Sequence, residues 1–235
     1  MAGTGWAAPL REALLDLLFP KRCVSCGRFG AFLCPVCRGG LVPAAGERCP
    51  RCWRPSPGGA RCRECAGEGT LAALRSAYVF GGPSRDLVHA LKYGHVTALA
   101  SLMAEPLAEA AALLPERPAV VVPVPLHRRR LRERGYNQAD LLGREVARRL
   151  GVRAAPEALV RRRATRPQPA TQSAEERHRN VQDAFLCPRP YLIAGSVVVL
   201  IDDVTTTGAT LASCAAELRR CGAARVYGLT FTIED

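Results

Sequence analysis

Eight of the eleven cysteines in this 235-residue chain lie close together, as four C-x-x-C pairs within residues 23–65. Two intervening residues allow both thiolates of one turn to reach the same ion, and two such turns complete a tetrahedral site of four sulfurs. In a chain expected to be intracellular, cysteines paired at this spacing indicate bound metal rather than disulfides. The pairs are Cys23/Cys26, Cys34/Cys37, Cys49/Cys52 and Cys62/Cys65.

The segment around these cysteines, residues 20–69, is rich in Gly, Pro and Arg and poor in aliphatic residues. Such a segment cannot fold on a hydrophobic core alone, so its order must come from bound metal. We predict two structural Zn²⁺ sites in a double zinc ribbon, with iron–sulfur or redox cysteines as the alternatives. The sequence favours sequential pairing, although interleaved ribbons satisfy the same spacing. Four protein ligands leave no open coordination position, so neither ion is expected to be catalytic.

The remainder of the chain alternates apolar strands with amphipathic helices. Apolar strands that are each followed by a helix indicate a parallel sheet covered on both faces. The sequence therefore predicts an α/β domain over residues 74–235, preceded by the cysteine-rich module at 20–69 and a short helix within 1–19. Strands are expected near residues 75–80, 118–123, 191–194, 196–202 and 225–232, and helices near 84–92, 96–114, 136–150 and 209–221.

The formal net charge of the chain is +12 at pH 7, and the excess is concentrated in its middle. Residues 117–179 contain 16 Arg against 6 acidic residues, a balance of +10. An anionic partner is therefore expected to dock in or near this block. No uncharged run exceeds thirteen residues, whereas a transmembrane helix needs about twenty apolar residues. We therefore expect no membrane span and a cytoplasmic location.

An apolar strand that ends in two acids and a Thr/Gly turn is the most informative motif of the second domain. It reads VVVLIDDVTTTGAT over residues 197–210. A helix N-terminus with free amides and hydroxyls binds phosphate readily, and Gly208 allows close backbone approach. The adjacent carboxylates of Asp202 and Asp203 would repel that phosphate unless they face ribose hydroxyls or a Mg²⁺ ion. The plainer alternative is a Thr run that caps a helix, with Asp202 as an ordinary cap.

A basic segment, VPVPLHRRRLRERGYNQA at residues 122–139, follows a second predicted strand. A basic loop at the carboxyl end of a parallel strand is a suitable place for pyrophosphate. Taken alone, the same arginines fit a solvated face equally well. The candidate pyrophosphate-binding residues are Pro123, Val124, Pro125, His127, Arg128, Arg132 and Arg134.

Residues 198–210 resemble the phosphoribosyl pyrophosphate (PRPP) motif of type I phosphoribosyltransferases, which consists of four apolar residues, two acids and T-T-G-x-T. Further motifs are the T-x-x-Q from Thr165 to Gln168 and the R-x-x-N from Arg177 to Asn180. With the basic segment and the cysteine module, these motifs make the chain resemble the ComF (competence protein F) family. The resemblance implies a type I phosphoribosyltransferase-like domain behind a double zinc ribbon, and a role in the uptake of single-stranded DNA.

The resemblance also implies roles for individual residues. Asp202 and Asp203 would bind the ribose hydroxyls of PRPP together with Mg²⁺, and Lys92 would lie near the nucleotide site. The turn residues that would bind PRPP are Thr205, Thr206, Thr207, Gly208, Ala209 and Thr210. The polar loop at 161–183 would supply a lid through Arg163, Thr165, Gln168 and Arg177.

Three functions are compatible with these features. The favoured one is a PRPP-binding protein of the ComF type that acts in DNA uptake or recombination through single-stranded DNA, with competence or recombination proteins as further partners. The alternative is an active phosphoribosyltransferase, for which the sequence identifies neither an acceptor pocket nor a catalytic base. The third, a transcriptional regulator, lacks a helix-turn-helix signal. Tyr136 is the only aromatic residue of the basic block, which leaves few side chains for base stacking.

Overall fold

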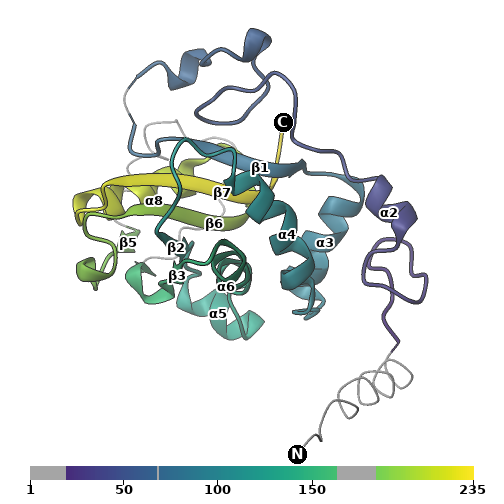
Figure 1. Ribbon diagram of the computed structural model, residues 1–235. Helices are drawn as coiled ribbons and strands as arrows, with labels where there is room; N and C mark the ends of the chain where they lie inside the picture. The colour runs from purple at the N-terminus through teal and green to yellow at the C-terminus, as the bar shows by residue number, and fades with distance from the viewer. Residues whose placement is uncertain (1–19, 68, 163–183) are drawn as a thin grey trace, which may run out of the picture.

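A five-stranded parallel sheet forms the centre of the second domain (Figure 1). The computed structural model describes residues 20–67, 69–162 and 184–235. The strand order is β1-β7-β6-β2-β3, and all neighbouring strands are parallel. The predicted parallel α/β architecture is therefore confirmed. The strands are β1 (Leu74–Val79), β2 (Val120–Pro123), β3 (Arg153–Ala154), β6 (Val197–Thr205) and β7 (Arg225–Ile233).

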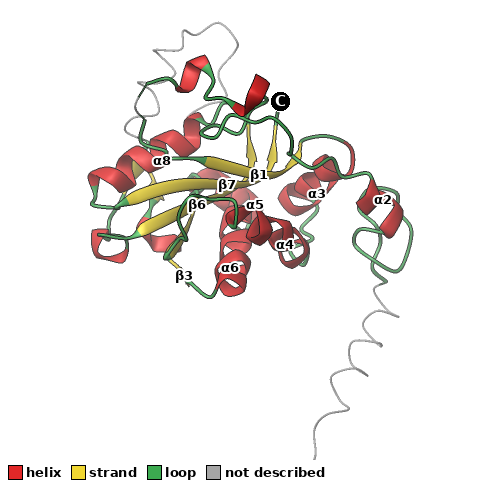
Figure 2. Ribbon diagram, turned by 45° about the horizontal axis from the view of Figure 1, so that its top comes forward, coloured by secondary structure: helices red, strands yellow, loops and turns green. Residues whose placement is uncertain are grey.

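Successive side chains of β6 divide between two hydrophobic cores, one on each face of the sheet. Val199 and Ile201 belong to the core that α3, α4 and α6 cover, whereas Val198 and Leu200 belong to the core beneath α8. All four side chains are fully buried, as expected of a central strand covered on both faces. Figure 2 shows α8 on the opposite side of the sheet from α4 and α6. The helices are α3 (Gly82–Tyr93), α4 (Leu99–Ala111), α6 (Gln138–Leu150) and α8 (Ala209–Arg220).

The parallel arrangement brings two predicted motifs to the same edge of the sheet. β2 and β6 are neighbours, and Pro123 at the end of β2 is aligned with Ile201. The basic segment leaves the carboxyl end of β2, and the Thr/Gly turn leaves the carboxyl end of β6. Ligands of open α/β sheets bind at this edge.

The cysteine-rich module packs against the outer strand β1. Pro43, between the two ribbons, pairs antiparallel with Tyr78, and Ala44 N donates to Ala77 O at 2.9 Å. This pairing covers an edge that would otherwise expose unpaired backbone groups. The short helical elements of the module are α2 (Pro35–Gly39), η1 (Pro57–Gly59) and η2 (Arg63–Cys65).

Arg75 of β1 fixes the second ribbon to the sheet. Its guanidinium lies 4.2 Å from the ring centre of Trp53. It donates to Pro50 O at 2.8 Å and to Leu113 O at 3.0 Å. The residue is only 7% exposed, so these contacts replace the water that it has lost.

The strand predicted near residues 191–194 is wrong. Pro190–Leu192 forms a 3₁₀ turn, η4, in which Ile193 N and Ala194 N both donate to Pro190 O at 2.9 Å. Proline carries no N–H for a strand ladder, and Gly195 follows with a φ of +68°. The apolar run therefore belongs to a turn.

Other segments add to what the sequence predicts. Residues Arg128–Arg134, expected to be a loop, form helix α5. Two short strands, β4 (Val160–Arg161) and β5 (Phe185–Leu186), pair antiparallel at the two ends of the polar loop, and Pro156–Ala158 forms the 3₁₀ turn η3.

The helix predicted within 1–19 and the lid residues lie outside the described residues. In the part of the chain that is described, no helix combines the length and apolar character needed to cross a membrane.

Replacing Arg75 by Ala should loosen the second ribbon from the sheet. We expect the free energy of unfolding to fall by about 2–3 kcal/mol, because a cation–π contact and two hydrogen bonds are lost at a buried site. Urea denaturation measures this change. The control is Arg144→Ala, which removes an exposed i,i+4 ion pair with Asp140 and should cost less than about 0.5 kcal/mol. Equal losses in both variants would contradict the role of Arg75.

Candidate functional site

The eight paired cysteines form two separate clusters, one in each ribbon. Cys26 Sγ and Cys34 Sγ are 3.6 Å apart, and Cys52 Sγ and Cys62 Sγ are 3.7 Å apart. A tetrahedral ion with Zn–S bonds of about 2.3 Å separates its ligand sulfurs by about 3.8 Å. The clusters therefore fit zinc-ribbon sites, in the sequential arrangement that the spacing favours. They consist of Cys23, Cys26, Cys34 and Cys37, and of Cys49, Cys52, Cys62 and Cys65.

Backbone N–H groups point at one sulfur in each cluster. Cys34 N donates to Cys23 Sγ, and Cys62 N donates to Cys49 Sγ, both at 3.4 Å. Burial opposes ionisation of Cys23 and Cys49, but backbone N–H donors outweigh it and lower the pKa of each thiol to about 6. A hydrogen bond with a neighbouring thiol, followed by burial, raises the pKa of Cys37 to about 12. A divalent cation accommodates all four thiolates together, so the donor set fits Zn²⁺.

Asp203, near the end of β6, is a buried carboxylate with partners on two helices. It is 2% exposed. Lys92 Nζ, from the last turn of α3, lies 2.5 Å from its Oδ2, and Gln138 Nε2, at the start of α6, donates to its Oδ1 at 3.1 Å. Arg134 of α5 donates in turn to Gln138 Oε1. These four residues, called the Asp203 network below, connect α3, α5, α6 and β6.

Asp202 has different surroundings from Asp203. Its Oδ1 accepts a hydrogen bond from Asp203 N at 2.9 Å, and Arg161 of β4 lies close enough to interact electrostatically with it. Desolvation, followed by the charge of Asp203, raises the pKa of Asp202 well above its usual range. A ribose hydroxyl or a metal cation placed here would give this carboxyl group a favourable partner.

The Thr/Gly turn joins β6 to α8, and the capping alternative for Asp202 does not hold. Asp202 lies inside β6, and Gly208 is the N-cap of α8, with φ +75° and no side-chain cap hydrogen bond. Thr206 and Thr207 are exposed, and Thr207 Oγ1 accepts from Ala209 N at 3.4 Å. The turn therefore presents hydroxyl groups beside the first amides of α8, as a phosphate site requires.

The basic segment begins beside this turn. Val124 N donates to Ile201 O at 2.9 Å, which extends the pairing of β2 with β6 by one residue beyond Pro123. His127 has a structural role, since its Nδ1 accepts from Arg129 N at 3.3 Å and caps α5. The candidate residues Pro123, Val124 and Pro125 thus lie at the sheet edge, and His127 lies at the helix N-terminus.

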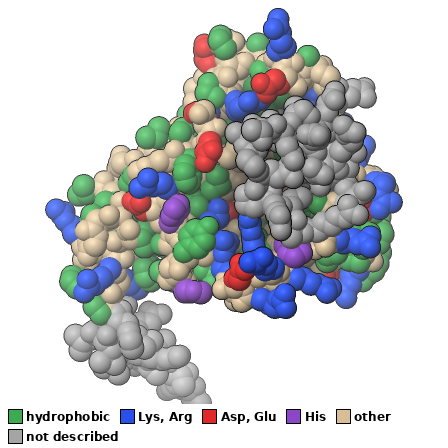
Figure 3. Space-filling model, turned by 180° about the vertical axis from the view of Figure 1, so that it is seen from behind, with side chains coloured by type: hydrophobic (Ala, Val, Ile, Leu, Met, Phe, Trp, Pro, Cys, Tyr) green, Lys and Arg blue, Asp and Glu red, His purple; other side chains and the backbone are tan. Residues whose placement is uncertain are grey.

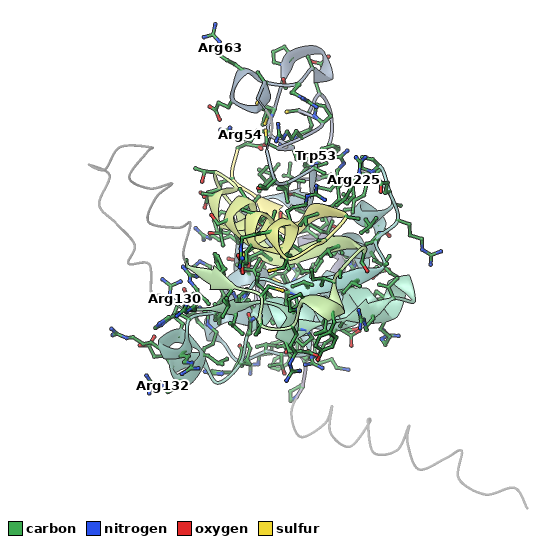
Figure 4. The ribbon with its side chains drawn as sticks, turned by 90° about the vertical axis from the view of Figure 1, so that its left-hand side faces the viewer. Trp53, Arg54, Arg63, Arg130, Arg132 and Arg225 are labelled. Atoms are coloured by element: carbon green, nitrogen blue, oxygen red, sulfur yellow. The ribbon has the colours of Figure 1, made fainter. Side chains whose placement is uncertain are left out.

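The arginines of α5 differ in how far they are already engaged. Arg134 donates to Gln138, whereas Arg128 and Arg132 are exposed and have no hydrogen-bond or ion-pair partner among the described residues. Figure 4 shows Arg130 and Arg132 projecting from α5, far from Arg63 of the second ribbon. Seen from behind the view of Figure 1, Lys and Arg side chains gather at the lower middle of the surface, with histidines beside them (Figure 3).

Some residues of this site were not predicted from their local sequence. Lys92 was placed near it only by resemblance, and Gln138 and Arg161 were not among the candidates. The signal for Arg161 was an arginine directly after the apolar residues Leu159 and Val160. Gln138 gave no signal beyond its place in the basic segment. The lid candidates Arg163, Thr165, Gln168 and Arg177 lie outside the described residues.

Replacing Cys23 by Ser should release one zinc ion per chain and leave the second ribbon filled, because the two clusters share no ligand. Elemental analysis of the purified protein should give two Zn²⁺ for the wild type and one for the variant. The control is Cys221→Ser, which changes a cysteine outside both clusters and should retain both ions. Loss of both ions from Cys23→Ser would contradict two independent sites.

Family models match both the cysteine-rich module and the α/β domain. Residues 14–66 match the double zinc ribbon domain family, and residues 139–231 match the phosphoribosyl transferase domain family. Among solved structures, an adenine phosphoribosyltransferase from Thermoanaerobacter pseudethanolicus is 22% identical, with a TM-score of 0.34, and the match covers 59% of this chain and 67% of that one. For glutamine PRPP amidotransferase from Bacillus subtilis the identity is 20%, the TM-score 0.40, and the match covers 57% of this chain and 26% of that one.

Curated relatives match over longer stretches. The DNA utilization protein YhgH of Escherichia coli (strain K12) is 35% identical over 234 residues, which is 95% of this chain and 94% of the relative. Competence protein ComFC of Bacillus subtilis is 28% identical over 188 residues, 76% of this chain and 74% of the relative. Competence protein F of Haemophilus influenzae is 37% identical over 115 residues, 48% of this chain and 50% of the relative. The two domain matches, the 35% identity to YhgH along nearly the whole length and the matches to the two competence proteins show that the chain belongs to the ComF (competence protein F) family.

Proposed function

We propose that this protein binds PRPP at the carboxyl edge of its sheet and acts on single-stranded DNA in uptake or recombination. The observation that carries PRPP binding is the exposed Thr/Gly turn, where Gly208, which has no side chain, begins α8 in a left-handed conformation. A 5′-phosphate held there receives amide and hydroxyl donors together with the positive end of α8. The residues that would hold it are Thr205, Thr206, Thr207, Gly208, Ala209 and Thr210.

Asp202 and Asp203 would contribute unequally to binding the ribose of PRPP. Asp203 is already neutralised by Lys92, whereas Asp202 lies in a partly exposed position. Asp202 is therefore the carboxylate that would accept a ribose hydroxyl, or hold Mg²⁺ through oxygen ligands of the kind that this ion prefers. Bound Mg²⁺ would neutralise part of the pyrophosphate charge. The arginines of α5 and the backbone at 123–125 would hold the rest of the pyrophosphate.

The DNA part of the proposal rests on charge and on the relatives. The relatives are named for DNA utilization and for competence. On α5, Arg129 is paired with Glu133, but Arg128, Arg130 and Arg132 have no such partner within the described ranges. Free guanidinium groups on one short helix suit a phosphate backbone. We place the protein in the cytoplasm, where thiols remain reduced and available to zinc.

Transfer of ribose 5-phosphate from PRPP to an acceptor is the second candidate function. Arg161, at the base of the polar loop, lies near Asp202, at the position from which a lid would exclude water from an oxocarbenium-like transition state. Release of pyrophosphate from PRPP and Mg²⁺ in the presence of a panel of bases tests this activity.

Replacing Thr207 by Ala should weaken PRPP binding about tenfold to a hundredfold, because one charge-assisted hydrogen bond is worth about 1.5–3 kcal/mol. Isothermal titration calorimetry with PRPP and with ribose 5-phosphate, each with and without Mg²⁺, measures the loss. Ser213→Ala is the matched control, since the Ser213 hydroxyl donates to Ala209 O inside α8 and lies outside the turn. If neither ligand binds the wild-type protein at millimolar concentration, PRPP binding is refuted.

Replacing Arg128, Arg130 and Arg132 together by Gln should weaken single-stranded DNA binding and its dependence on salt. Each lost phosphate contact should lower the slope of log affinity against log salt by about 0.7, so the triple variant should lose about 2. Fluorescence anisotropy across a salt series measures the slope. Arg144 and Arg148 of α6 are paired with Asp140 and Glu145, so their replacement by Gln is the control and should change the slope little. An unchanged slope in the α5 variant would refute this contact surface.

A further inference from the structure

A pocket of about 400 Å³ opens between the end of α3 and helix α5. This volume lies within the usual range for small-molecule sites. Lys92 connects the pocket to the proposed PRPP site, because its Nζ lies 2.5 Å from Asp203 Oδ2. Two of its lining residues have an expected role already, Arg134 toward pyrophosphate and Lys92 near the nucleotide site, but no role has been assigned to Tyr93, His95, Arg130 or Glu133 in this pocket. Its lining residues are Lys92, Tyr93, His95, Arg130, Glu133 and Arg134.

Tyr93 presents an aromatic ring at the opening of this pocket. Its side chain is 66% exposed, so most of the ring is accessible from the pocket. The guanidinium of Arg134 lies 5.1 Å from the ring centre, and the His89 ring meets it edge-on at 5.8 Å. These contacts hold the ring in one orientation and leave much of its surface open to a ligand.

His95 is held in the same pocket by a tight turn. Its φ is +55°, a left-handed conformation that non-glycine residues rarely adopt. Its ring meets Tyr136 edge-on at 5.8 Å, and Tyr136 is itself anchored by a hydrogen bond from its hydroxyl to Leu91 O. A Cβ atom at position 94 would lie 2.9 Å from Ala90 O, so only glycine fits at this position of the turn. The backbone of this turn thus places the ring of His95 beside the ring of Tyr136.

The charge of the lining is suited to a ligand that carries both a ring and a phosphate. Three cations face one anion, Glu133, but Lys92 is paired with Asp203, and Arg134 is engaged by Gln138 and by the ring of Tyr93. Arg130 has no ion-pair or hydrogen-bond partner within the described part of the chain. One cation is therefore available to a phosphate group, while the aromatic rings favour a planar partner.

We propose that this pocket binds a nucleobase, stacked on Tyr93, with the phosphate of the same nucleotide directed to Arg130. Single-stranded nucleic acids and mononucleotides share this chemistry, and base–aromatic stacking tolerates any base. This inference deepens the proposed function and rests on it in one respect: PRPP is taken to occupy the adjoining site. It also supplies the stacking residues that the basic block lacks, because Tyr93 and His95 are distant from that block in sequence but lie against α5.

Two pairs of probes isolate the contribution of the base. The first pair is AMP against ribose 5-phosphate, and the second is a short oligodeoxyadenylate against an abasic strand of equal length. In each pair only the base differs. We expect Tyr93→Ala to weaken binding of the base-bearing member about tenfold to a hundredfold and to leave its base-free counterpart unchanged. Tyr93→Phe keeps the ring and should bind as the wild type does.

The matched control is Tyr191→Ala. Tyr191 is 73% exposed, lies in the η4 turn and is not part of this pocket, so its loss should change neither pair. An effect of Tyr93→Ala on AMP alone identifies a free nucleotide as the ligand, and an effect on the oligonucleotide alone identifies a base of single-stranded DNA. Either outcome supports the pocket. No effect on either pair overturns it.

PRPP affinity, measured in parallel, separates this proposal from the preceding one. Tyr93→Ala should bind PRPP as the wild type does, because PRPP carries no base. If the wild-type protein fails to bind PRPP, the proposed PRPP site is refuted, and the two probe pairs still decide whether the pocket takes a base. If PRPP binds but Tyr93→Ala leaves both pairs unchanged, only the nucleobase pocket is refuted.

Discussion

A carboxylate that is 2% exposed at the end of a central strand needs a cation and hydrogen-bond donors, because an unpaired buried charge is strongly destabilising. Asp203 obtains both, from Lys92 and Gln138. Since these partners lie at the end of α3 and the start of α6, neutralising one charge fixes two helices against β6. Tyr93 directly follows Lys92, and Arg134 binds Gln138, so the walls of the nucleobase pocket depend on the same interaction.

The two ribbons differ in composition from the α/β domain, but they are packed closely against it. Cys23 and Leu33 are buried in the helix-side core, and Ser25 Oγ donates to Asp86 Oδ2 of α3 at 2.7 Å. The chain between the ribbons also covers the edge of β1 through Pro43. Metal bound at the two cysteine clusters would thus order residues that complete the sheet edge and part of the core. Zinc in this position would stabilise the second domain as well as the ribbons.

The features that the sequence predicted well are those set by spacing along the chain. Four C-x-x-C pairs predict two four-cysteine sites, and the structure shows them in the favoured sequential pairing. The long apolar run of β6 identifies a buried parallel strand. The strand prediction at 191–194 is wrong because the apolar composition of this run suits a strand, and only Pro190 and Gly195 indicate a turn. The arginines of α5 show no apolar period, so the sequence predicts a loop there. The helix is stabilised by the His127 cap at its N-terminus and by the ion pair between Arg129 and Glu133.

The polar contacts of the site could not be predicted in the same way. Lys92 and Asp203 are more than a hundred residues apart, and their contact depends on where α3 ends relative to β6. Tyr93 and Arg134 likewise come together only in the folded chain. Local sequence identifies which residues can carry charge or stack. It does not identify their partners when the packing of separate elements brings them together.

Zinc binding would also determine where anions are attracted. Residues 1–70 carry a balance of +5 in sequence, and two four-thiolate zinc centres of charge −2 each would reduce it to about +1. The +10 balance of residues 117–179 would stay unchanged. In the second ribbon, Arg54 is paired with Glu64, and Arg51 binds Cys65 O, so these arginines are already engaged. The metallated protein would therefore attract anions chiefly to the 117–179 block, which includes the arginines of α5. PRPP and single-stranded DNA would draw on the same arginines there, so each should weaken the binding of the other.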